Sequence, residues 1–322
     1  MGHHAAMRAR VWVAFAAVSV LWGVPYFFIK LALAELSPGF LAWSRVAIGV
    51  VLLLPVAWRA GALRGLWSRR AWLLTFTLTE ITIPWVLIPV GERWVSSSLT
   101  AILIAAVPLT VGLLAIRMDP AERPTGLGLA GLLIGLAGVV ALVGIDVAGR
   151  PLELLGAACI LVATLGYALS TIIVRRHLAD LHPLGPVTAA LTVSALVLAP
   201  LAFLSPPRHL PSAQALASLA VLGTACTALG LVLFFFLIVE AGATRAAIVT
   251  YVNPAVAVLL GVVLLGERLT AVAVAGLLLI LAGSWLSTGG RRPPGAAAVL
   301  RRARRLLRPA DPVGLRRGGG GG

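Results

Sequence analysis

Residues 22–38 read WGVPYFFIKLALAELSP, and residues 167–183, which lie 145 positions later, read YALSTIIVRRHLADLHP. The same offset relates ERPTGLGLAGLLIGLAG at 122–138 to ERLTAVAVAGLLLILAG at 267–283. The first pair shares an aromatic, a basic, an acidic and a proline position, and the second pair shares Glu-Arg and Leu-Ala-Gly. The chain therefore contains an internal repeat.

The composition is that of a polytopic membrane protein. Hydrophobic residues make up 60% of the chain and charged residues 11%, and 322 residues leave room for about ten helices of roughly 20 residues each. Hydropathy and length predict spans at 11–33, 39–58, 72–90, 97–117, 126–145, 152–174, 184–204, 214–239, 244–265 and 270–288. The predicted fold is all-α, with ten transmembrane helices.

An odd number of spans in each copy determines how the two copies are oriented. After five spans the chain is on the other side of the bilayer, so the second copy begins from the opposite face and the repeats are inverted. We predict a first five-helix repeat at 11–145, a second at 146–288, and a basic, Gly/Arg-rich tail at 289–322 that is disordered.

The net charge of +15 reflects membrane topology rather than nucleic-acid binding. The N-terminus, the even-numbered loops and the tail carry 20 of the 26 basic residues, and the odd-numbered loops carry four. By the positive-inside rule both termini are cytoplasmic, and we expect no nucleic-acid partner. The remaining two cations, Lys30 and Arg45, lie within spans. Lys30 is close to the end of its span, so we expect it to reach the interface as an anchor.

No motif of a soluble enzyme is present. The G-x-G-x-x-G pattern at 126–131 lies in an apolar stretch with no preceding strand, so it is no nucleotide site; its glycines instead predict close packing of the fifth and tenth helices. Cys159 and Cys226 fall inside apolar spans, where a disulfide or a metal site is not expected. We therefore expect no enzymatic activity, no cofactor and no metal.

Glu80 is the main candidate for chemistry, because it lies near the middle of the third span, where an ionisable group is costly. Burial favours the protonated carboxyl, which could exchange a proton for a cationic or zwitterionic substrate. Pro84 leaves the carbonyl of Glu80 without its helical donor and favours a kink. Three roles stay open for Glu80: a structural pair with Arg45, substrate contact, and proton coupling. The sequence offers no second well-buried carboxylate.

Aromatic and polar residues lie near prolines in several other spans. Carbonyls that proline releases in a membrane must be met by protein, water or substrate, and transporters build their sites on such broken helices. The predicted substrate-binding residues are Glu80, Arg45, Trp22, Tyr26, Trp85, Tyr167, Thr171, Tyr251 and Asn253, with kinks at Pro25, Pro84, Pro108 and Pro254. The alternative is that these aromatics are packing groups and the prolines static bends.

Six stretches together resemble the EamA family of the drug/metabolite transporter superfamily: LWGVPYFFIKLAL, LSPGFLAWSR, SSSLTAILIAAVPL and ERPTGLGLAGLLIGLAGV in the first half, and YVNPAVAVLLGVVLLGERL and AVAGLLLILAGSWL in the second. The resemblance covers about residues 11–288, and the VNP, GER and LAG run is its most specific part. The first half departs from the pattern at 118–123, MDPAER, where a Leu-Gly-Glu-Arg type of turn is usual. This departure concerns the geometry of that loop and leaves the expected fold unchanged.

The resemblance implies a multi-pass carrier of the bacterial inner membrane, often an exporter of amino acids, amines, drug-like compounds or other small metabolites. Its site would lie between the helices of both repeats and work by alternating access. We expect a small-molecule substrate and a lipid bilayer as partners, and we leave proton coupling and a homodimer open. The alternatives are a lipid or lipid-linked sugar flippase and, from another class, a membrane-embedded enzyme or an assembly protein. Family membership does not name the ligand.

Overall fold

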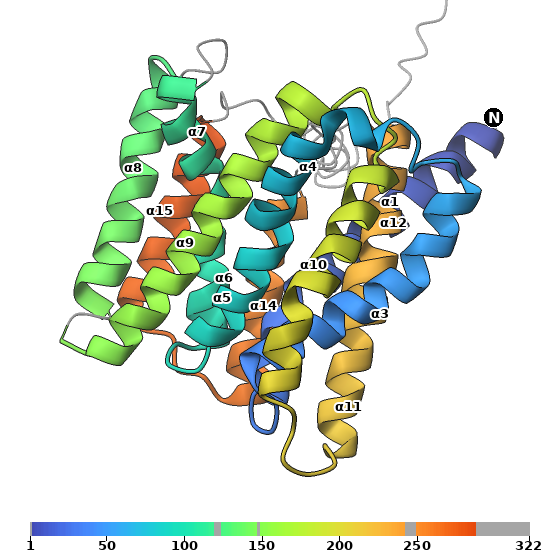
Figure 1. The fold of residues 1–322 in the computed structure, drawn as a ribbon. Helices are drawn as coiled ribbons and strands as arrows, with labels where there is room; N and C mark the ends of the chain where they lie inside the picture. Colours follow the sequence, from blue (N-terminus) through green and yellow to red (C-terminus); the bar gives the residue numbers. More distant parts are fainter. Residues whose placement is uncertain (1, 119–123, 147–148, 242–248, 288–322) are drawn as a thin grey trace, which may run out of the picture. The chain divides into compact units, whose positions relative to one another are not determined.

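The computed structural model describes residues 2–118, 124–146, 149–241 and 249–287, and in these ranges every regular element is a helix (Figure 1). The first half contains α1 (Gly2–Gly23), α2 (Pro25–Ala32), α3 (Pro38–Arg59), η1 (Leu66–Arg69), α4 (Arg70–Phe76), η2 (Thr77–Thr82), α5 (Ile83–Gly91), α6 (Ser97–Ile104), α7 (Val107–Met118), α8 (Leu127–Ala141) and η4 (Leu142–Asp146). The second half contains α9 (Pro151–Ile173), η5 (Val174–Leu178), α10 (Leu184–Leu204), α11 (Ala213–Ala220), η6 (Val221–Leu229), α12 (Gly230–Ala241), α14 (Val249–Leu265) and α15 (Ala271–Ser287).

Eight helical stretches of the described ranges are long and apolar enough to cross a membrane, and the two shorter apolar helices α14 and α15 complete the set. The predicted all-α fold of ten transmembrane helices in two inverted repeats is confirmed. The third span is longer than predicted, because it runs from Leu66 to Gly91. Part of the predicted ninth span, the turn at 119–123 and the predicted tail at 289–322 lie outside the described residues.

The two halves pack with the pattern of a two-fold axis. The second span (α3) packs on its equivalent, the seventh (α10), and the fifth (α8) packs on the tenth (α15). The other contacts are reciprocal: the third span packs on the sixth through α5 and α9, and the first packs on the eighth through α1 and α12. Figure 1 shows α8 beside α15 and α3 beside α10. Inverted repeats related in this way surround a shared central site in secondary transporters.

Serine caps begin several helices at the membrane surface. The hydroxyl oxygen of Ser37 accepts a hydrogen bond from the amide of Phe40 at 3.2 Å at the start of α3, where Pro38 suits the first turn. Ser96 and Ser212 make the same kind of cap for α6 and α11. These caps satisfy amides that would otherwise be left without acceptors at helix ends, so each span begins at a defined residue.

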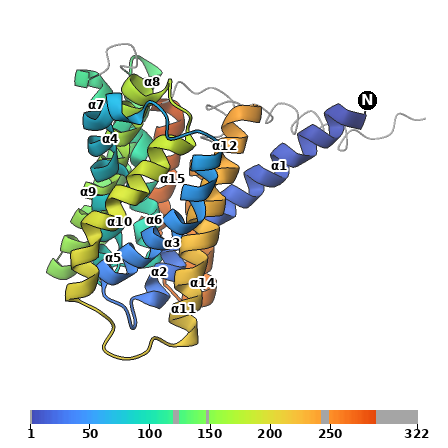
Figure 2. The ribbon, with the colours of Figure 1, turned by 45° about the vertical axis from the view of Figure 1, so that its right-hand side comes forward.

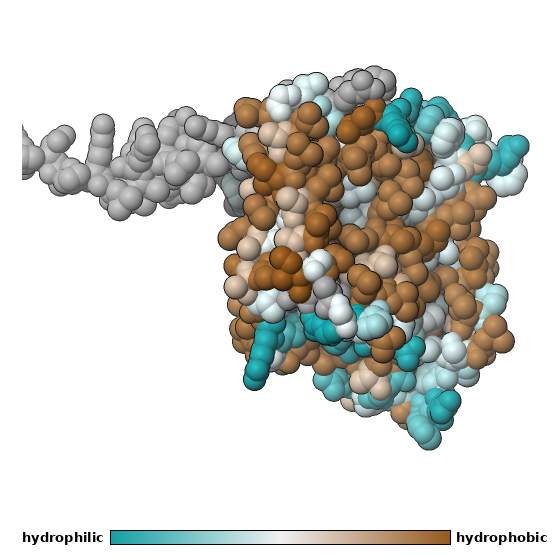
Figure 3. Space-filling view, turned by 90° about the vertical axis from the view of Figure 1, so that its left-hand side faces the viewer, coloured by the Kyte–Doolittle hydropathy of each residue, from teal (hydrophilic) through white to brown (hydrophobic). Residues whose placement is uncertain are grey.

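Close packing of α8 on α15 depends on glycine. A Cβ atom on Gly283 would lie 2.5 Å from the carbonyl oxygen of Gly131, and one on Gly138 would lie 3.0 Å from the carbonyl oxygen of Gly276. The predicted close approach of the fifth and tenth helices is therefore present. On the face that Figure 3 shows, an apolar band lies between polar edges. Large hydrophobic residues of α8, including Leu133 and Val140, are exposed. Such a band suits contact with lipid.

Hydrogen bonds between the halves lie at both ends of the bundle. We call the end that carries Glu35, Glu92 and Glu267 the Glu92 end, and the opposite end the Arg69 end. At the Glu92 end, Ser37 donates to the main-chain oxygen of Ser205 at 2.8 Å. At the Arg69 end, the guanidinium of Arg69 donates to Asp180 at 3.0 Å.

Two π-helical segments occupy equivalent places in the two halves. η2 lies within the third span and η6 within the eighth, and residues 222–227 of η6 follow η2 by 145 positions. A π-helical turn interrupts the regular i→i−4 ladder and is frequent at functional sites. Both segments supply residues to the cavity described next.

Candidate functional site

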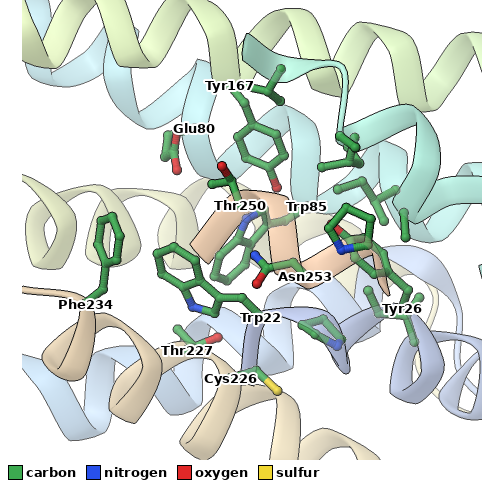
Figure 4. A pocket seen from close by; sticks show the side chains of 18 of the residues that line it. Trp22, Tyr26, Glu80, Trp85, Tyr167, Cys226, Thr227, Phe234, Thr250 and Asn253 are labelled. Atoms are coloured by element: carbon green, nitrogen blue, oxygen red, sulfur yellow. The ribbon is translucent and has the colours of Figure 1, made fainter. Parts of the chain in front are cut away.

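A cavity of about 350 Å³ lies between the helices of the two halves (Figure 4). Its wall includes eight of the nine predicted binding residues and three of the four predicted prolines: Trp22, Tyr26, Arg45, Glu80, Trp85, Tyr167, Thr171, Asn253, Pro25, Pro108 and Pro254. Cavities that hold small ligands span roughly 300–1,000 Å³, so this one suits a single small metabolite.

Tyr251 and Pro84, which we also predicted at the site, are not part of the cavity wall. The hydroxyl of Tyr251 lies 3.4 Å from the main-chain oxygen of Ser284 on α15. Pro84 faces α9, where a Cβ atom on Gly166 would lie 3.2 Å from its ring. Both residues therefore hold neighbouring helices rather than face the cavity.

Broken helices form much of the wall. The first span is interrupted at Val24, and α2 restarts with Pro25 as its first residue, so α1 leaves the bundle at a different angle (Figure 2). The fourth span is interrupted between Ile104 and Val107, one residue before Pro108. In contrast, α14 continues through Pro254 without a break. Proline removes one backbone donor at each place, and the carbonyl one turn earlier is left for another partner.

Arg45, from α3, brings a positive charge into the cavity. Its guanidinium carbon lies 3.8 Å from the centre of a ring of Trp85, and its Nε atom donates to the hydroxyl of Thr227 on η6 at 3.0 Å. In the described part of the chain, neither terminal nitrogen of Arg45 has a hydrogen-bond partner. A guanidinium offers these two nitrogens as a fork that fits a carboxylate.

Glu80, from η2, places an acidic side chain in the same cavity. One of its carboxylate oxygens accepts a hydrogen bond from the hydroxyl of Ser170 on α9. The pair with Arg45 that the sequence left open does not form: among the described residues, the side-chain ion pairs join Arg69 to Asp180 and Arg150 to Glu153. Arg45 is held by an aromatic ring and a hydroxyl instead, so the two charges remain separate.

Aromatic rings surround the two charges. Trp22 packs against Phe234 of α12, with ring centres 4.6 Å apart, and Tyr26, Trp85 and Tyr167 complete the aromatic part of the wall. Figure 4 shows the hydroxyl of Tyr167 directed toward the middle of the group. The cavity thus combines apolar rings with two opposite charges.

Asn253 connects two spans at the cavity. In the orientation that satisfies its amide, the side-chain nitrogen donates to the main-chain oxygens of Val249 at 2.9 Å and Ser19 at 3.0 Å. Gly23 lies nearby, where a Cβ atom would come within 2.9 Å of the main-chain oxygen of Asn253. This amide therefore holds α14 against α1, in addition to facing the cavity.

The Glu92 end contains two features that differ from the predictions. Lys30 does not reach toward the interface; its ammonium donates to the main-chain oxygens of Glu92 at 2.6 Å and Val95 at 2.8 Å. The expectation of a single well-buried carboxylate is also wrong, because Glu92 is 0% exposed. Glu92 is fully buried and Lys30 partly buried, and both lie at the loop between α5 and α6.

Glu267 caps α6 from the other half. Gly266 turns the chain with φ +64°, and the carboxylate of Glu267 then accepts hydrogen bonds from the amides and hydroxyls of Ser97 and Ser98, at 2.6–2.9 Å. Partial burial acts to raise the pKa of Glu267, but the four hydrogen bonds together outweigh it and hold the pKa below its usual range. The ionised carboxylate therefore ties the segment after α14 to the start of α6.

Sequence reasoning did not single out several of the residues that complete the cavity and its surroundings. Thr227 and Cys226 come from η6, and their equivalence to the η2 segment that carries Glu80 is the signal that could have identified them. Glu92 left no comparable signal, because it directly follows the third span, where a charged residue is usually hydrated.

Ten apolar helices in inverted repeats, with a cavity of mixed polarity between them and broken helices in its wall, define a membrane transporter. The sequence pattern of the EamA-like transporter family matches the chain twice, at residues 10–144 and 154–289. The chain therefore belongs to the EamA-like transporter family, as its resemblance predicted. This is a family of transporters rather than of enzymes.

Individual proteins agree with this assignment. An uncharacterized transporter of Archaeoglobus fulgidus is 25% identical over 279 residues, which cover 85% of this chain and 97% of the relative. The uncharacterized transporter YvbV of Bacillus subtilis is 25% identical over 278 residues, which cover 85% and 90%. One crystal structure of a protein matches with a TM-score of 0.61 and 18% identity, covering 93% of this chain and 99% of that one, and this likeness shows the fold alone.

Proposed function

We propose that this transporter carries a small zwitterion with an apolar or aromatic side chain, such as an amino acid, by alternating access. The observation that supports the proposal is that Arg45 and Glu80 line one cavity without forming an ion pair with each other. A carboxylate on the substrate can take the fork of Arg45, and an ammonium group can take Glu80. The aromatic wall then receives the side chain.

Charge and family support a proposal for the membrane and for the direction of transport. The basic residues of the Arg69 end support a cytoplasmic location for that end and for both termini, in the inner membrane of a bacterium. Export of the zwitterion would then proceed from the Arg69 end to the Glu92 end. Glu80 remains the candidate for exchanging a proton against the ammonium group of the substrate.

Solute exchange in proteoliposomes tests the substrate class. Vesicles preloaded with phenylalanine, with its decarboxylated amine or with its deaminated acid are each diluted into the matching labelled compound. We expect exchange of the zwitterion to exceed that of both analogues, because only the zwitterion engages both charges. Equal exchange of the three compounds would contradict the proposal. Arg69→Gln serves as the matched control, since its guanidinium pairs with Asp180 away from the cavity and its loss leaves the selectivity unchanged.

A lipid flippase is the second candidate, and one observation favours it. An apolar groove lies beside η6 and is lined by Leu52, Leu53, Val56, Thr224, Ala225, Ala228, Leu229 and Val232. Such a groove has the chemistry to hold an acyl chain. Scrambling of a fluorescent phospholipid in the same vesicles, without exchange of any of the three solutes, would favour this candidate.

A further inference from the structure

Glu92 is a fully buried carboxyl group that lies outside the cavity. It directly follows Gly91, the last residue of α5, its exposure is 0%, and neither of its carboxylate oxygens has a hydrogen-bond partner in the described part of the chain. An ionised carboxylate in such a place loses its hydration and gains no hydrogen bond in exchange. The neutral, protonated carboxyl is therefore the form that this packing favours.

The charged groups around Glu92 are engaged elsewhere. Lys30 of α2 directs its ammonium at two main-chain oxygens, and Glu267 accepts four hydrogen bonds from Ser97 and Ser98 of α6. The charges of Lys30 and Glu267 are opposite and balance each other. With Glu92 neutral, the cluster of Lys30, Glu92 and Glu267 therefore has no net charge. From α9, Gly156 and Ile160 contact Gly91, and neither carries a charge.

The electrostatics agree with the geometry. Burial raises the pKa of Glu92 well above its usual range, the ammonium of Lys30 opposes this rise, and the carboxylate of Glu267 adds to it. A proton on Glu92 is thus favoured for as long as the surrounding segments stay packed.

The position of Glu92 connects its burial to closure of the transporter. Ile88, one turn earlier on α5, lines the cavity, and so does Ile29, the neighbour of Lys30. Glu92 and Lys30 therefore lie just beyond the cavity wall, toward the Glu92 end. Any opening of the cavity toward this end must separate α2, the loop between α5 and α6, or the segment after α14, and water would then reach the carboxyl.

We propose that Glu92 is a proton-binding site that controls the opening of the Glu92 end. The carboxyl holds a proton while α2, the loop at 92–96 and the segment after α14 are packed together. When these segments separate, the carboxyl is hydrated and releases the proton to water, and it takes one proton back from water before they close. Acid on this side of the membrane stabilises the closed end, and alkali favours its opening.

Hydrogen exchange of the protein in lipid nanodiscs, without any substrate, tests this inference. Exchange rates at residues 92–100 are divided by the chemical rate at each pH, from about pH 5 to about pH 9, a range chosen because a buried carboxyl titrates above its usual value. Since one proton is linked to opening, protection of this segment should fall by up to tenfold per pH unit between the usual pKa of a hydrated carboxyl and the raised pKa of buried Glu92, and it should level off above the raised pKa. In Glu92→Gln, which imitates the protonated carboxyl, protection should not depend on pH.

Glu35→Gln is the matched control. Glu35 is a carboxylate at the same end, but it is exposed and hydrogen-bonded to the amide and hydroxyl of Ser212, so this variant should keep the wild-type pH dependence. Protection that is independent of pH in the wild type, or a pH dependence that survives in Glu92→Gln, would overturn the proposal.

A second measurement does not depend on folding of the Glu92→Gln variant. Infrared spectra of Glu80→Gln, which lacks the carboxyl of the cavity, should show the C=O band of a buried protonated carboxyl at neutral pH. Glu92→Asp in the same background should shift that band, whereas absence of the band would overturn the proposal. Because no substrate is used, failure of the zwitterion proposal would leave these outcomes unchanged.

Discussion

Arg45 lies with its guanidinium carbon 3.8 Å from the centre of a ring of Trp85, in a cavity that also contains the carboxylate of Glu80. A cation in the membrane interior is thus stabilised by an aromatic face, and it stays available for an anionic group. An ion pair with Glu80 would have neutralised both charges. The proposed zwitterion site rests on the fact that Arg45 packs on Trp85 and does not pair with Glu80.

Arg45→Lys should weaken substrate binding although it keeps the positive charge. Lysine cannot stack on Trp85 or offer a two-pronged fork, so the carboxylate of the substrate loses at least one charge-assisted hydrogen bond, worth about 1.5–3 kcal/mol. We expect the KM for exchange of phenylalanine to rise roughly 10- to 100-fold. Exchange of the decarboxylated amine should change little, and an equal loss for both compounds would argue against contact with the carboxylate.

Glu80→Gln should reverse the preference between charged analogues. Glutamine can still accept the hydrogen bond from Ser170, but it attracts no ammonium group, so the deaminated acid should exchange as well as the zwitterion or better. Proton movement under a pH gradient, driven by addition of the zwitterion, should also disappear if Glu80 carries the proton. Ser170→Ala is the control, because it removes the hydroxyl partner and keeps the charge. If Glu80→Gln left transport and its pH dependence unchanged, Glu80 would neither contact the substrate nor carry the coupled proton.

Gly283→Ala should destabilise the protein by forcing α8 away from α15. The added Cβ would lie 2.5 Å from the main-chain oxygen of Gly131, closer than such atoms come in proteins, and overpacking of this kind costs about 1–3 kcal/mol. Thermal unfolding in detergent, followed by loss of helical circular dichroism, measures the change. Gly128→Ala on the same interface is the control, since the nearest atom to its Cβ would be the main-chain oxygen of Ser287, at an ordinary contact distance of 3.4 Å. Equal unfolding temperatures of both variants would contradict this account.

Glu267→Gln should destabilise the cap of α6 at neutral pH. An amide replaces a carboxylate that accepts four hydrogen bonds, and for a partly exposed group we expect a loss of about 1–2 kcal/mol. Because the pKa of Glu267 is lowered in the folded protein, its contribution is present above the usual carboxyl pKa and is lost as the pH falls through the lowered value. The difference in unfolding temperature between wild type and variant should therefore shrink in acid. A difference that persists there would exclude the ionised cap.

Depth in the membrane could be predicted from the sequence, and the direction in which a side chain points could not. Hydropathy placed Glu80 and Arg45 at compatible depths, and both line the cavity, but the ion pair that the sequence left open does not form, and Arg45 packs on Trp85 instead. Lys30 was expected to reach outward because it lies near the end of its span. Its ammonium donates instead to two main-chain oxygens of the loop after α5.

Burial of Glu92 depends on segments far apart in the chain. Hydrogen bonds join α2 to the loop after α5 and the segment after α14 to the start of α6, and no local pattern around residue 92 indicates that these segments come together. The inverted repeat, by contrast, could be predicted in full, because identical residues at a constant offset require no knowledge of packing. Repeated glycines in two apolar spans likewise predicted the close contact between α8 and α15. The π-helical segments could not be predicted, because no pattern in the sequence marks them.

The two π-helical segments differ in length: η2 covers six residues, Thr77–Thr82, and η6 covers nine, Val221–Leu229. In a carrier built from inverted repeats, each half can adopt the conformation that the other half has now, and this exchange produces the state that faces the opposite side. We therefore expect the third span to wind into the longer π-helical form as the eighth returns toward the shorter one. The structure thereby contains, in its second half, a template for the first half of the opposite-facing carrier.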